Sequence, residues 1–78
     1  MYNGYRNRAT WNVNLWIGND EGLYHAALDF VRNLGHRCYG ADALDFCYSI
    51  WPDGLTPDCD RVADAHMPEV AAMLRELA

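Results

Sequence analysis

The sequence contains no lysine, and its six arginines are outnumbered by eleven aspartates and glutamates, which gives a formal net charge of −5 at pH 7. Nucleic acids are polyanions, so a protein that binds them directly needs a basic patch that outweighs this balance. The sequence shows no basic stripe of that kind. We therefore expect no direct binding of DNA or RNA.

Long hydrophobic runs are missing too: none approaches the roughly 20 residues that cross a bilayer, and the opening MYNGYRNR leads into no signal-like apolar core. Cysteine is scarce. Cys38, Cys47 and Cys59 are an odd number, spaced nine and twelve residues apart, which favours reduced thiols over a disulfide framework. We expect a cytoplasmic protein with no membrane partner and with at least two buried cysteines.

The residues that are present are hydrophobic enough to fold. Apolar residues make up 51% of the 78 residues and aromatic residues 13%, which is too much for a disordered chain. The length predicts one globular domain, residues 1–78, with little room for a deep catalytic cleft beside the core. Residues 1–9 alternate between polar and aromatic types, and we expect a flexible lead-in there.

The spacing of apolar residues predicts a mainly α fold, a bundle of four or five short helices. The clearest helix follows Asp20, a suitable N-cap, and ends at Gly35. A largely buried helix is expected over residues 41–51, and a last helix with Pro68 in its first turn. The predicted core comprises Leu15, Leu23, Phe30, Leu44, Phe46, Trp51, Val62 and Leu74.

The sequence pattern allows alternatives in two segments. Residues Thr10 to Ile17 alternate like a half-buried strand, which would give an α+β fold, but Thr10 also suits a helix N-cap, and we favour the helix. Further along, Asp58 or Asp60 can cap a short helix that runs through Val62.

Histidine and cysteine suggest a metal site, but no CxxC, HxxxH or HExxH spacing is present. Nothing marks a cysteine as an activated nucleophile apart from Arg37 beside Cys38. Paired carboxylates need a pocket to separate their acidities, and a chain this short promises none. We expect no catalytic activity, no metal and no cofactor.

Aspartates are dense between Asp42 and Asp64, where the sequence has six of them and a single basic residue, Arg61. Helix capping and solvated faces explain part of this density, but like charges one helical turn apart are mutually unfavourable. An acidic surface is compatible with a basic protein partner. We predict that the partner-binding residues are Asp42, Asp45, Asp53, Asp58, Asp60 and Asp64. A second candidate anchor is Tyr5 with Arg6 and Arg8, and an untethered arm is the alternative there.

The stretch YNGYRNRATWNVNLWIGNDEGLY, Tyr2 to Tyr24, resembles the opening of small phage and mobile-element proteins with Thr-Trp-Asn, Leu-Trp-Ile and Asn-Asp-Glu-Gly-Leu-Tyr motifs. In size and acidity the chain is similar to anti-CRISPR proteins directed at type I-C systems. That resemblance implies an inhibitor in a bacterial host cell that binds Cas3 or the DNA-reading surface of Cascade. The alternative is a small phage or plasmid accessory protein that binds a host regulatory protein, and a thiol or metal enzyme comes third.

Overall fold

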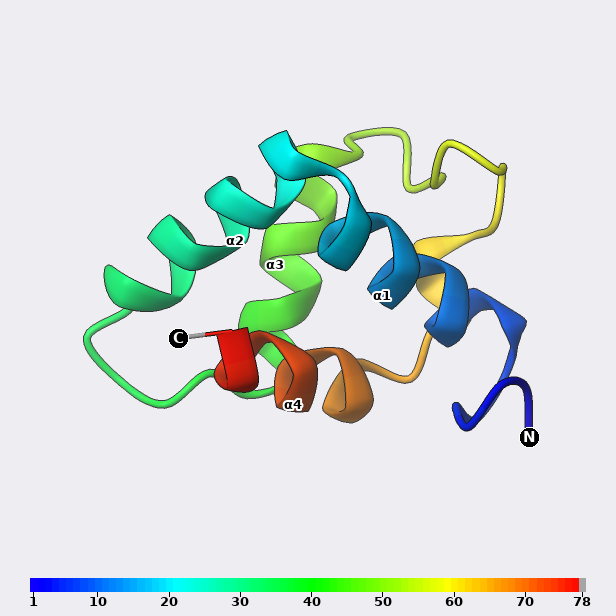
Figure 1. The fold of residues 1–78 in the computed structure, drawn as a ribbon, viewed down its shortest axis with the longest axis horizontal. Helices are drawn as coiled ribbons and strands as arrows, with labels where there is room; N and C mark the ends of the chain where they lie inside the picture. The colour runs from blue at the N-terminus through cyan, green and yellow to red at the C-terminus, as the bar shows by residue number, and fades with distance from the viewer. Residues whose placement is uncertain (78) are drawn as a thin grey trace.

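The chain folds into four α-helices and one short 3-10 turn, as a computed structural model that describes residues 1–77 shows (Figure 1). The helices are α1 (Arg8–Asn19), α2 (Glu21–Arg32), α3 (Gly40–Ile50) and α4 (Met67–Leu77), and the 3-10 turn η1 (Val62–Asp64) precedes α4. Residues 1–77 contain isolated β-bridges but no strand. The predicted mainly α bundle is confirmed.

Residues 10–17 are helical, so the strand alternative for this stretch is wrong. The N-cap of α1 is Asn7 and not Thr10, because the Asn7 Oδ1 atom accepts the Thr10 backbone N–H at 2.9 Å and its hydroxyl at 2.6 Å. Thr10 is fully buried, and its hydroxyl also accepts the His66 N–H at 2.8 Å. The helix therefore starts inside the predicted lead-in.

The rest of the lead-in is hydrogen-bonded to the folded chain. Tyr2 and Tyr5 exchange two backbone hydrogen bonds. The Arg6 N–H donates to Glu69 Oε1 at 3.0 Å, and the Asn7 side-chain amide donates to the Asp64 carbonyl at 2.8 Å. These bonds join the start of the chain to the segment that leads into α4.

Side-chain hydrogen bonds mark the starts of α2 and α3. Asp20 caps α2 as predicted, since its Oδ1 accepts the Leu23 N–H at 3.0 Å. The helix ends at Arg32, and Gly35 takes a positive φ of 73° in the following turn. At the start of α3, the Tyr39 N–H donates to Asp42 Oδ2 at 3.0 Å.

The core lies where the helices meet, with α3 packed on α4 and α1 packed on α2 (Figure 1). Four predicted core residues are buried, namely Phe46, Trp51, Val62 and Leu74. Leu15, Leu23 and Phe30 are half-buried. The placement of Leu44 in the core is wrong: it is 37% exposed, because the buried face of α3 carries Ala43, Phe46 and Cys47.

The predicted helix cap at Asp58 or Asp60 is also wrong. The short turn η1 begins after Arg61 and has no side-chain cap. Asp58 and Asp60 instead make their polar contacts with side chains of α1. The segment between α3 and η1 is thereby held against the first helix.

Candidate functional site

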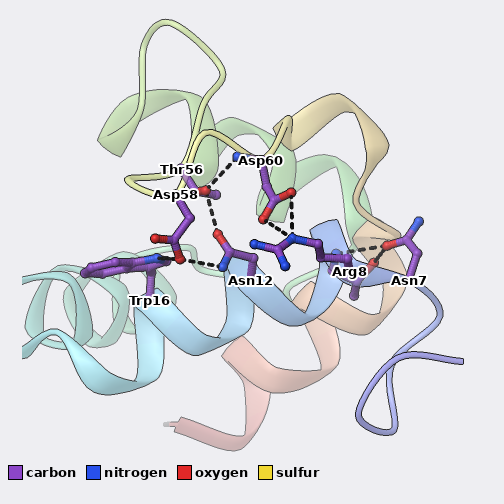
Figure 2. Close-up of polar contacts among 8 residues, drawn as sticks. Asn7, Arg8, Asn12, Trp16, Thr56, Asp58 and Asp60 are labelled. Atoms are coloured by element: carbon purple, nitrogen blue, oxygen red, sulfur yellow. Dashed lines mark hydrogen bonds and ion pairs between the residues drawn. The ribbon is translucent and has the colours of Figure 1, made fainter.

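A cluster of hydrogen-bonded side chains joins α1 to the segment 52–61 (Figure 2). We call it the polar seam and define it by Asn12, Trp16, Thr56 and Asp58. The Thr56 hydroxyl donates to Asn12 Oδ1 at 2.6 Å, and the Asn12 amide donates to Asp58 Oδ2 at 2.8 Å. The Trp16 indole N–H donates to the same carboxylate oxygen at 3.0 Å. Asn12 and Thr56 are both buried, and these hydrogen bonds give their side-chain polar atoms partners inside the fold.

A salt bridge extends this contact toward the start of α1. Arg8 Nε lies 3.1 Å from Asp60 Oδ2, and the Asp60 backbone N–H donates to the Thr56 hydroxyl at 3.1 Å. The Asp60 carboxylate raises the pKa of the Arg8 guanidinium, which is charged at any physiological pH. Arg8 thus links the start of α1 to the segment 52–61, and its side chain is still half exposed.

Two of the predicted aspartates are held by hydrogen-bond donors. The Asn12 amide and the Trp16 indole lower the pKa of Asp58. The Tyr39 N–H and the His36 side chain, whose Nε2 lies 3.0 Å from Asp42 Oδ1, lower the pKa of Asp42. Hydrogen bonds to a carboxylate favour its charged form. Both side chains therefore stay ionised at neutral pH.

The six predicted aspartates fall into two groups. Asp42 and Asp45 lie in the first half of α3, whereas the other four follow the end of that helix (Figure 1). In the second group Asp53 accepts the Leu55 N–H at 3.1 Å. Among the six, only the carboxylates of Asp45 and Asp64 make no hydrogen bond or ion pair within residues 1–77, and both residues are exposed. The fold thus uses four of the six side chains.

Sequence reasoning missed the polar seam and the role of Trp16 in it. The available signal was the placement of Thr10, Asn12 and Asn14 at alternate positions of an otherwise apolar stretch. All three are buried. Polar residues on the apolar face of a helix need partners, and two of these find them in segments more than forty residues away.

Two hollows lie on the surface formed by residues 1–77. One lies at the corner between α1 and α2, and its lining is Leu15, Trp16, Asn19 and Asp20. The other is a mainly apolar groove between α2 and α3. Its lining is Ala26, Asp29, Phe30, Asn33, Leu34, Phe46, Ser49 and Ile50. Neither hollow contains a cysteine or histidine beside a carboxylate.

Two of the three thiols are enclosed. Burial raises the pKa of the Cys47 thiol to about 12 and also raises that of Cys38, while Cys59 is exposed. Thiols with raised pKa values are poor nucleophiles at neutral pH. In the described part of the chain, no three histidine, cysteine, aspartate or glutamate side chains gather in a way that could hold a metal ion.

The fold and the seam define a small all-helical protein with a negatively charged surface. Over residues 1–77 the sequence matches the family of unknown function DUF7249, and the chain belongs to that family. No curated protein and no solved structure matches the chain. Within residues 1–77, every helix is too short or too polar to cross a membrane.

Proposed function

We propose that the protein is an inhibitor that covers a basic, nucleic-acid-binding surface of another protein. The observation that supports the proposal is that several of the aspartate carboxylates accept hydrogen bonds from uncharged donors. Asp58 and Asp53 accept hydrogen bonds from uncharged donors, and Asp42 accepts one from the Tyr39 N–H. Such donors fix a carboxylate in position without cancelling its charge.

Cations within the chain neutralise little of this surface. In residues 1–77 the only arginine that pairs with a carboxylate is Arg8, which contacts Asp60. Two histidines also lie beside carboxylates, His36 at Asp42 and His25 at Glu21, and they form ion pairs only when the imidazole is protonated. Uncompensated charge destabilises a compact protein by self-repulsion but speeds its encounter with a surface of opposite sign. This excess negative charge is therefore consistent with a surface that binds a basic partner.

The choice of target rests on the resemblance to type I-C anti-CRISPR proteins. It implies Cas3 or the DNA-reading surface of Cascade, and both present basic grooves for nucleic acid. Charge complementarity with the acidic surface supports either target. A host regulatory protein is the alternative partner, and the experiment below separates the two.

The test is a pulldown with purified Cas3 and Cascade, followed by affinity measurements at rising salt and in the presence of DNA. We expect binding that DNA displaces and that weakens with salt, because the Debye length falls from about 10 Å at 0.1 M to about 3 Å at 1 M. Failure of both proteins to bind would reject the CRISPR target. Binding that neither salt nor DNA affects would reject the acidic surface as the contact.

Structure-based variants locate the contact. Asp60 is unsuitable for charge reversal because Arg8 depends on it, whereas Asp45 and Asp64 have exposed carboxylates that the described fold does not use. The double variant Asp45→Lys/Asp64→Lys should therefore fold and bind more weakly, and the two single variants show which group makes the contact. Asp29→Lys/Glu76→Lys makes the same change in net charge outside the predicted set and is the matched control. Equal losses in the two variants would contradict the predicted site.

A further inference from the structure

The hollow at the corner of α1 and α2 combines an aromatic ring with negative charge. The Trp16 side chain is half-buried, and its indole N–H is bonded to Asp58, which fixes the ring (Figure 2). Leu15, Asn19 and Asp20 complete the lining. A fixed aromatic ring attracts cations through the negative charge on its face.

The end of α1 adds to this negative potential. Its last turn contains no basic side chain that could offset the partial negative charge of the terminal carbonyls. The neighbouring N-terminus of α2 has the opposite polarity, but Asp20 caps it and Glu21 lies in its first turn. Asp20 uses only Oδ1 for the cap, and within residues 1–77 its Oδ2 makes no hydrogen bond. One carboxylate oxygen is therefore left for a ligand.

We propose that this hollow binds an arginine side chain of a protein partner. A guanidinium stacks on an aromatic ring and donates several N–H groups, so one side chain can contact the Trp16 ring and the Asp20 carboxylate together. Leu15 offers an apolar surface to the methylene groups of the same side chain. The identification of the partner as a basic protein rests on the proposed function, whereas the arginine site itself rests on the hollow.

The test is an NMR titration of the ¹⁵N-labelled protein with the peptide acetyl-Gly-Arg-Gly-amide. The Trp16 indole N–H resonance should shift saturably, while those of Trp11 and Trp51 should move little. The matching peptide with glutamine in place of arginine should cause no saturable shift. The absence of a saturable shift with the arginine peptide, or an equal response to the glutamine peptide, would overturn the proposal.

Two neighbouring carboxylates provide a matched pair of variants. Asp20→Asn removes the charge but keeps the helix cap, because asparagine caps as well as aspartate. It should weaken the peptide about two- to fivefold, as expected for one exposed ionic contact of up to about 1 kcal/mol. Glu21→Gln removes the same charge from a residue outside the lining and should have a smaller effect. Equal effects would overturn the contact with Asp20.

This titration is independent of any CRISPR protein. A saturable Trp16 response together with no binding to Cas3 or Cascade would support the arginine site and reject the target. The converse result, binding to a target without any response to the arginine peptide, would reject the arginine site alone.

Discussion

Two asparagines on α1 are both buried, but they differ in their partners. Asn12 donates to Asp58 and accepts from Thr56. Asn14 is 5% exposed, and neither its side-chain nitrogen nor its oxygen has a hydrogen-bond partner within residues 1–77. A buried polar group without a partner costs about 1–3 kcal/mol, so these two residues should have opposite effects on stability.

We predict that Asn14→Leu raises the free energy of unfolding by about 1 kcal/mol, because it removes an unpaired amide from the interior. Asn12→Leu should lower it by about 2–3 kcal/mol, because Thr56 and Asp58 both lose a partner. Urea unfolding followed by circular dichroism measures both values. A loss of stability in Asn14→Leu as large as that in Asn12→Leu would show that the Asn14 amide is satisfied in solution.

Asp58 should make the protein sensitive to acid. Its pKa is lowered in the folded state, so its contribution to stability is complete above the unfolded pKa of about 4 and is lost as pH falls through the folded value. In Asp58→Asn, the loss in unfolding free energy relative to wild type should be constant near pH 7 and should shrink below pH 4. Asp45→Asn is the control for removal of an exposed charge. A loss that does not change with pH would contradict this role of the Asp58 carboxylate.

At the scale of elements, local spacing was sufficient to predict the helical segments but not the segment between α3 and η1. Helical periodicity and caps depend on residues three or four positions apart, and Asp20 and Pro68 therefore lie where the sequence places them. The contacts of Asn12 and Trp16 with Asp58 span 46 and 42 residues, and no local pattern contains them. The prediction of Leu44 as a core residue was wrong for a related reason, because the helices packed on α3 decide which of its sides is buried.

Gly54 allows the chain to turn after α3. It has a positive φ of 76°, and a Cβ atom there would lie 3.1 Å from the Tyr48 ring. Gly35 has a similar φ of 73°, but a Cβ atom there would meet nothing within 4 Å. We predict that Gly35→Ala costs about 1 kcal/mol from backbone strain alone and that Gly54→Ala costs more, because the ring must also move. Thermal unfolding measures both, and equal losses would show that the ring moves freely.

For the molecule as a whole, the sequence predicted that the surface is negatively charged. It did not predict how the fold distributes that charge. Counting charges identified six aspartates as one patch, yet two of them lie on α3 and four follow its end. Four of these side chains also serve the fold, which a count of charges does not reveal. The corner at Trp16 and Asp20 was visible only as a turn motif, because its hollow depends on the meeting of two helices.

The attachment of residues 52–61 to α1 has a consequence for dynamics. No large apolar side chain in this segment is buried, and its contacts to α1 are hydrogen bonds and one salt bridge. Detaching it would expose little apolar surface, so the free energy of that opening should depend only weakly on denaturant. Native-state hydrogen exchange of the Trp16 indole N–H, which donates to Asp58 across this contact, measures the dependence. Such an opening would release Asp58 and Asp60 from α1 while the four helices stay folded.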